Sequence, residues 1–329
     1  MQYLKLCTLA SVLVLSACQL TPSTTQLVAS TPMHDAASHK ENRFDQLKLN
    51  HKKPIVALVL GSGGARGYAH IGVIEVLEKK GIRPDFIVGT SAGSIVGSIY
   101  ASGKSAAELR NIALDMKATD VRDFKIGMKG FFDGKKVEDY VNKQVGNRAL
   151  QSLKIPMFVV ATELKNGQQT VFNYGNTGQA VRASVTIPSM FIPTIIADKE
   201  YVDGGLVSPV PVNIARELGA DVVIAVDILA QPRYTETSNV WGLFNQNINI
   251  MQNKLAEKEL SNADIVIQPD LREKAHIFDV SGREQTIQQG VLATQNKIKA
   301  IETVLQRSEI HKLNLHNELN PPNEITLKQ

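Results

Sequence analysis

The spacing of hydrophobic residues predicts alternating strands and helices from residue 54 onward. The continuous apolar run at 55–60 is typical of a strand buried on both faces. A glycine-rich segment follows, and apolar residues then recur at helical spacing up to Lys80, where Gly81 is a typical helix stop. The same reasoning predicts strands at 86–89, 157–161, 169–172, 199–202, 222–227 and 265–267, and helices at 92–101, 105–117, 135–145, 212–218 and 282–305. We therefore expect an α/β fold, with a mostly parallel central sheet covered by helices on both faces.

The two ends of the chain depart from this pattern. Residues 1–17 carry one lysine and then a short apolar run, the shape of a secretory signal peptide. The run ends in Leu15–Cys18, which resembles the lipobox of bacterial lipoproteins, in which the cysteine becomes the acylated first residue. The alternative is a plain signal peptide with an incidental cysteine. Residues 18–53 have few large apolar side chains and predict a flexible tether, and residues 306–329 predict a polar, loose tail.

Composition and charge exclude several classes of protein. The chain has 329 residues, of which 43% are hydrophobic and 21% charged, so a mostly disordered or collagen-like chain is excluded. A net charge of +4 and 5% aromatic residues give no indication of nucleic-acid binding. Cys7 and Cys18 are the only cysteines, and Cys7 lies in the predicted signal peptide. The mature chain is therefore expected to contain no intramolecular disulfide.

A G-x-S-x-G motif at residues 89–93 predicts a serine nucleophile. Gly89 and Gly93 allow a strand and a helix to pack closely around a sharp turn that exposes the hydroxyl of Ser91. Such a pentapeptide arises by chance in roughly one ordinary chain in ten. Here the motif follows a predicted strand and precedes a predicted helix, as a nucleophile turn requires. We therefore interpret Ser91 as the nucleophile.

The glycine-rich segment Gly61–Gly67 also lies between a strand and a helix. A dinucleotide loop would require a third glycine where Arg66 stands, and a phosphate-binding P-loop would require a Gly-Lys-Ser/Thr ending that is missing. The remaining interpretation is an oxyanion hole, in which backbone N–H groups at a helix N-terminus face a developing negative charge.

Two residues compete for the role of base. In a Ser-His-Asp enzyme of the α/β-hydrolase order the histidine comes late, and His276 has the only suitable position, although a loop or surface role is the more ordinary one. His70 is interpreted as a packing or capping residue. Asp203 follows a short predicted strand and precedes two glycines, which by itself indicates a turn. It could nevertheless share the sheet rim with Ser91, where burial would make it a better base.

These motifs, in this order, resemble those of the patatin-like phospholipase family. That family has a glycine-rich oxyanion loop with G-x-R-G, then G-x-S-x-G, then D-G-[AG] more than a hundred residues later, and residues 180–188 and 203–211 also resemble its segments. The match covers residues 54–305, and Ser62 stands where many members have glycine. The motif glycines in this chain are Gly61, Gly67, Gly89, Gly93, Gly204 and Gly205.

The resemblance implies a patatin-like three-layer fold and a Ser-Asp dyad without histidine. Ser91 would be the nucleophile and Asp203 its proton acceptor. The N–H groups of Gly63 and Gly64 would form the oxyanion hole, with Arg66 close by. Neither a metal nor a cofactor is implied.

The expected function is that of a serine lipid acyl hydrolase of the phospholipase A or lysophospholipase type. Its partners would be an acyl-ester lipid and the membrane that holds acylated Cys18, and Gln19 after the cysteine favours the outer membrane by resemblance to Gram-negative lipoproteins. An esterase or thioesterase on soluble substrates and a non-catalytic lipid-binding lipoprotein are the alternatives. The mixed segment 125–132 is either a mobile rim that touches lipid through Met128, Phe131 and Phe132, or ordinary loop packing.

Overall fold

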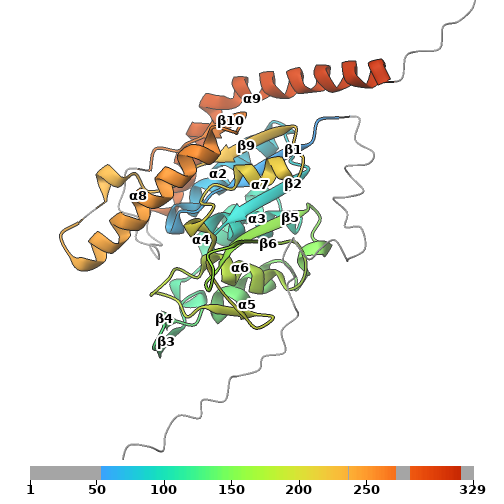
Figure 1. The fold of residues 1–329 in the computed structure, drawn as a ribbon. Helices are drawn as coiled ribbons and strands as arrows, with labels where there is room; N and C mark the ends of the chain where they lie inside the picture. The colour runs from blue at the N-terminus through green and yellow to red at the C-terminus, as the bar shows by residue number, and fades with distance from the viewer. Residues whose placement is uncertain (1–52, 236, 272–281, 320–329) are drawn as a thin grey trace, which may run out of the picture.

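The computed structural model describes residues 53–235, 237–271 and 282–319, and its centre is an eight-stranded sheet (Figure 1). Five strands run parallel in the order β10-β9-β1-β2-β5. Three more join antiparallel, with β6 and β8 on β5 and β7 on β8. The bounds are β1 Val56–Leu60, β2 Phe86–Thr90, β5 Met157–Glu163, β6 Gln169–Phe172, β7 Thr194–Ile196, β8 Lys199–Asp203, β9 Val222–Val226 and β10 Ile265–Ile267. The predicted α/β fold class is confirmed.

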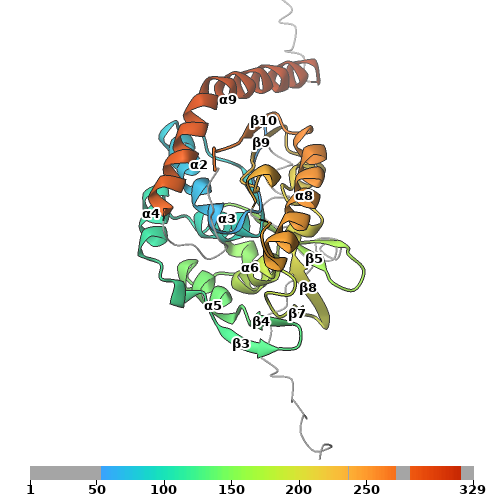
Figure 2. The ribbon, with the colours of Figure 1, turned by 90° about the vertical axis from the view of Figure 1, so that its left-hand side faces the viewer.

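Helices cover both faces of the sheet, as expected (Figures 1 and 2). Alternate strand residues supply two separate cores: Leu58 and Ile87 face one layer, whereas Val59 and Val88 face the other. Residues of α2–α6 and α9 build the first core, and those of α7 and α8 contribute to the second. The bounds are α2 Tyr68–Lys79, α3 Ala92–Ala101, α4 Ala106–Asp115, α5 Lys135–Gln144, α6 Thr177–Val185, α7 Val212–Glu217, α8 Val240–Leu260 and α9 Arg283–Leu319. Short 3₁₀ turns are η2 Gly64–Gly67, η3 Ala118–Asp120, η4 Leu150–Ser152, η5 Gly204–Leu206 and η6 Pro232–Tyr234.

The segment predicted to form a rim is a β-hairpin of β3 (Phe124–Gly127) and β4 (Gly130–Phe132). The rings of Phe132 and Phe191 lie 5.6 Å apart, and those of Phe132 and Phe124 lie 6.0 Å apart. Phe132 therefore packs against the protein, and the expectation that it touches lipid is wrong for this residue. Met128 and Phe131 are exposed, so that part of the hypothesis stays open.

The last helix is longer than the sequence analysis expects. The predicted helix ends at Leu305, before a loose tail, whereas α9 continues to Leu319. The expectation of a loose tail is therefore wrong for residues 306–319. No glycine or proline interrupts residues 291–319, and the paired prolines come only at 321–322, so nothing in the sequence ends the helix earlier.

Helices α2 and α9 cross at very short distance. A Cβ atom added to Gly72 would lie 2.0 Å from the carbonyl oxygen of Ile287, and one added to Gly290 would lie 2.0 Å from that of Ala69. Both crossing points therefore require glycine. None of the described helices is long and apolar enough to span a membrane. The predicted signal peptide, Cys18, His276 and residues 320–329 lie outside the described residues, and residue 53 is the only described part of the predicted tether.

Candidate active site

Ser91 occupies a sharp turn between β2 and α3. Its backbone has φ 52° and ψ −119°, a conformation that non-glycine residues rarely adopt. A Cβ atom on Gly93 would lie 2.0 Å from the carbonyl oxygen of Leu60, and one on Gly89 would lie 2.7 Å from that of Gly93. The two motif glycines are thus required for close packing of the helix on the sheet, as the sequence motif indicates.

Asp203 meets Ser91 at the rim of the sheet although 112 residues separate them. It is the last residue of β8, which pairs with β5 through Ala161. The Ser91 hydroxyl donates a hydrogen bond to Asp203 Oδ2 at 2.7 Å, and both side chains are buried. The second oxygen, Oδ1, accepts the N–H of Gly205 at 2.7 Å. The structure therefore brings the two predicted catalytic residues into direct contact.

Burial changes the acid–base properties of Asp203. Desolvation raises the pKa of this carboxyl to about 6, while hydrogen bonds from Ser91 and Gly205 act in the opposite direction. A carboxylate with that pKa is still mostly ionised at pH 7, and it is a stronger base than an exposed aspartate. The electrostatics thus suit proton transfer from a serine hydroxyl.

The glycine-rich loop lies beside Ser91, since Gly64, Gly67 and Ser91 line one cavity. Gly64 has φ 57°, and a Cβ atom on Gly63 would lie 2.6 Å from Ile228 Cδ1. The N–H groups of Gly63 and Gly64 donate no hydrogen bond to any of the described residues. Two donors that have no partner among the described residues, in a loop that lines the cavity beside Ser91, are what an oxyanion hole needs.

Hydrogen bonds to other segments of the chain hold this loop in place. The Ser62 N–H donates to the carbonyl oxygen of Pro209 at 2.8 Å, and Arg66 Nε donates to that of Ile228 at 2.8 Å. Burial lowers the pKa of Arg66 to about 10, and the nearby carboxylate of Asp227 offsets part of that change. At least this nitrogen of Arg66 serves to anchor the loop. That Arg66 also contributes to the oxyanion hole stays a prediction.

His70 is buried on α2 and also contacts the loop. Its Nε2 lies 2.9 Å from the carbonyl oxygen of Gly61, and burial lowers its pKa to about 4. The imidazole is therefore neutral at pH 7, and it must donate its Nε2 proton because a carbonyl can only accept. His70 fixes the loop, consistent with the packing or capping role expected for it.

Sequence reasoning missed four polar residues that hold the site. The Ser91 N–H donates to Ser184 Oγ at 2.8 Å, and Thr90 Oγ1 donates to the Ser208 carbonyl oxygen at 2.9 Å. Glu259 of α8 accepts from Ser208 Oγ at 2.6 Å and from the Val210 N–H at 3.3 Å. Burial raises the pKa of Glu259 to about 7. These partners lie 49 to 118 residues apart in the sequence, so no local spacing could have revealed them.

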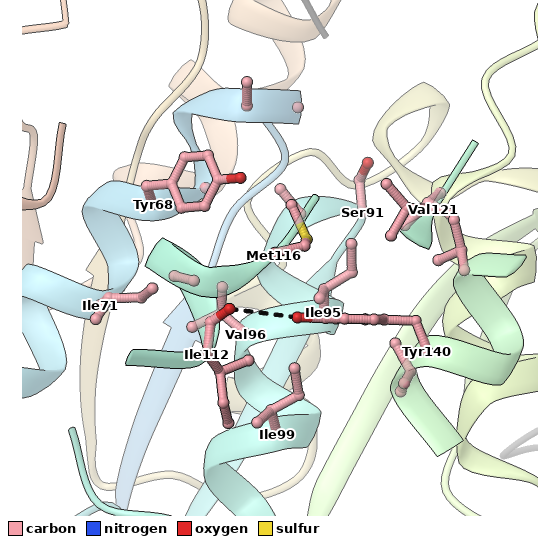
Figure 3. A pocket seen from close by; sticks show the side chains of 18 of the residues that line it. Tyr68, Ile71, Ser91, Ile95, Val96, Ile99, Ile112, Met116, Val121 and Tyr140 are labelled. Carbon is pink, nitrogen blue, oxygen red and sulfur yellow. Dashed lines mark hydrogen bonds between the residues drawn. The ribbon is translucent and has the colours of Figure 1, made fainter. Parts of the chain in front are cut away.

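An apolar cavity of about 160 Å³ leads away from Ser91 (Figure 3). Its walls include Ile95, Ile99 and Phe191. Tyr140 crosses it, and its hydroxyl donates to the Ile112 carbonyl oxygen at 3.5 Å. The shape and lining suit an acyl chain. No group of three potential metal ligands occurs among the described residues.

Several known proteins are similar to this chain. Residues 58–216 match the family model of patatin-like phospholipases. An uncharacterised NTE family protein of Mycobacterium tuberculosis is 37% identical over 177 residues, which is 53% of this chain and 49% of that protein. Human patatin-like phospholipase domain-containing protein 6 is 30% identical over 220 residues, 63% of this chain and 16% of that protein. The chain thus spans about half the length of the mycobacterial relative, and a smaller part of the human one. VipD from Legionella pneumophila superposes with a TM-score of 0.44 and 14% identity, over 78% of this chain and 67% of that chain.

Proposed function

Because this chain belongs to the patatin-like phospholipase family, we propose that it is a serine lipid acyl hydrolase of the phospholipase A or lysophospholipase type. The observation that carries the proposal is the 2.7 Å hydrogen bond from Ser91 Oγ to Asp203 Oδ2. This pair lies next to an apolar cavity and a loop in which two N–H groups have no partner among the described residues.

The geometry supports acyl transfer in two steps. Asp203 accepts the hydroxyl proton as Ser91 Oγ attacks the ester carbonyl carbon, and the N–H groups of Gly63 and Gly64 stabilise the oxyanion. Asp203 then protonates the leaving alcohol, and the acyl group stays on Ser91. Water attacks the acyl-enzyme, with Asp203 again accepting and returning a proton, and the free fatty acid leaves.

Acyl-ester lipids are the proposed substrates because the cavity beside Ser91 is apolar and narrow. We also propose that the enzyme is exported and anchored to the cell envelope through acylated Cys18, a proposal that rests on the sequence of residues 1–18 alone. An anchored hydrolase would lie next to its lipid substrates.

The test is a set of three substitutions assayed on phospholipids, lysophospholipids and a short soluble ester. Asp203→Asn keeps the shape of the side chain but removes the proton acceptor, so we expect a loss of about 10²–10⁴-fold in kcat, comparable to Ser91→Ala. His276→Ala should change the rate only slightly.

The controls separate the alternatives. A fluorophosphonate probe should label the parent protein but not Ser91→Ala, and a lipid-binding protein without turnover would not be labelled in either form. A folded His276→Ala protein that loses activity on the scale of Asp203→Asn would refute the dyad. Hydrolysis of the soluble ester alone would favour the esterase alternative.

A further inference from the structure

The first three turns of α8 expose an apolar stripe. Val240, Leu243, Ile250 and Met251 are 86%, 52%, 45% and 62% exposed. At 3.6 residues per turn, these four residues lie within roughly 100° of the helix surface, with Asn247 among them. In a soluble protein a stripe of this width normally faces the core.

The opposite face of these turns is polar and packs against the preceding loop. Gln246 donates to the carbonyl oxygen of Pro232 at 3.0 Å, and Asn249 donates to Thr235 Oγ1 at 3.0 Å. Asn253 donates to the carbonyl oxygen of Ala230 at 2.8 Å. The side-chain amides thus fix the orientation of the helix, and its apolar stripe is held toward solvent.

The β3–β4 hairpin carries a second set of exposed apolar side chains. Phe124, Met128 and Phe131 are 70%, 107% and 54% exposed. Lys125 and Lys129 alternate with them along the hairpin and bind acidic neighbours on the protein. The hairpin therefore combines apolar tips with basic side chains.

Both features adjoin the candidate active site. Phe132, at the base of the hairpin, packs against Phe191, which lines the cavity. The Gln252 side chain of α8 lies beside Gly205, two residues after Asp203. Figure 1 shows α8 and the hairpin on the same side of the molecule, and Figure 2 looks onto that side.

We propose that the outward stripe of α8 and the tip of the β3–β4 hairpin dock together onto a lipid surface. This proposal rests on the proposed function, since it says how a lipid substrate reaches Ser91. Docking itself requires no turnover. The apolar cavity beside Ser91 adjoins the hairpin, so an acyl chain leaving the surface would meet apolar side chains along its path.

A lipid surface fits these features better than a second protein does. Apolar side chains with basic and aromatic neighbours are typical of segments that lie in the headgroup region of a bilayer. A further basic residue, Arg233, lies in the loop before α8. It stacks over the half-exposed ring of Tyr234 at 4.8 Å.

The experiment measures binding without turnover and without the predicted anchor. The full chain carrying Cys18→Ser and Ser91→Ala is mixed with sucrose-loaded vesicles of phosphatidylcholine and phosphatidylglycerol and then sedimented. Leu243→Ser with Met251→Ser, and separately Met128→Ser with Phe131→Ser, should each lower the partition constant at least about tenfold. The matched control is Ile310→Ser with Leu313→Ser on α9, where the side chains are similarly exposed but the partition constant should not change.

Two results would overturn the proposal. One is that the parent protein does not sediment with vesicles, or that both doubly substituted proteins sediment as well as the parent does. The other is that the parent protein is a dimer in size-exclusion chromatography, and that the α8 or hairpin substitutions abolish the dimer but leave vesicle binding intact. Circular dichroism checks folding, and if one pair unfolds the protein, the other pair decides. If the chain with Ser91 intact hydrolyses no lipid, the proposed function is refuted, but the result of the vesicle-binding experiment still stands.

Discussion

The conformation of Ser91 determines what each of its polar groups can reach. With φ at 52°, its hydroxyl points to Asp203 while its N–H donates to Ser184 on another helix. Backbone conformations of this kind cost about 1–3 kcal/mol in a non-glycine residue. The candidate nucleophile is therefore held in a strained position by its neighbours.

A comparison of two inactive variants should reveal this strain. Ser91→Ala and Ser91→Gly both remove the hydroxyl and its hydrogen bond, but only glycine relieves the positive φ. Glycine also loses more entropy on folding, which offsets part of the gain. We expect Ser91→Gly to be more stable than Ser91→Ala by about 1 kcal/mol in urea unfolding. Equal stabilities would show that the turn is unstrained.

The proposed dyad predicts that activity falls in acid, because Asp203 as the base must be ionised to accept a proton. Its pKa of about 6 in the folded free enzyme places this loss in kcat/KM below about pH 6, and activity should rise toward a plateau at higher pH. A pH profile on a soluble ester measures it. Glu259 has a pKa of about 7, so Glu259→Gln is the control, and the fall below pH 6 should persist in that variant.

Ser91 and Asp203 can be predicted from the sequence because both stand where a predicted strand ends, which places them at the rim of the sheet. The glycines beside each of them indicate a turn. Ser184, Ser208 and Glu259 could not be predicted in this way. Their hydrogen bonds join distant segments, and nothing in the local sequence around a single serine or glutamate distinguishes it from a surface residue.

Among the elements, the parallel strands are predictable because burial on both faces leaves continuous apolar runs. Helix α8 is not, because in its first turns the inward face carries asparagine and glutamine and several apolar residues face outward. The β3–β4 hairpin is short and irregular, so its segment suggests only a loop.

The crossing of α2 and α9 should tolerate no side chain larger than hydrogen at its two glycines. Gly290→Val places a branched side chain against the backbone of Ala69, and we expect the free energy of unfolding to fall by about 2–3 kcal/mol. Gln288→Val introduces the same residue at an exposed position of the same helix and should change stability by less than about 1 kcal/mol. Urea unfolding of both proteins measures these changes. Equal losses in the free energy of unfolding would mean that α2 and α9 can move apart at no cost.

For the whole molecule, the expected anchor determines where the enzyme works. Cys18→Ser should abolish incorporation of radiolabelled palmitate, and the protein should leave the membrane fraction or remain unprocessed, while its folded domain keeps esterase activity. Equal labelling of the mutant would refute the anchor.

The contact between α2 and α9 also bears on the order in which the candidate active site is assembled. Helix α2 begins directly after the glycine-rich loop, and α9, which packs against it, follows both Ser91 and Asp203 in the chain. Arg283, the first residue of α9, also donates to the carbonyl oxygens of Ala113, Leu114 and Met116 at the end of α4. A nascent chain therefore carries Ser91 and Asp203 before it has the helix that supports the loop beside them. We therefore expect acyl hydrolysis to begin only after α9 has docked on α2.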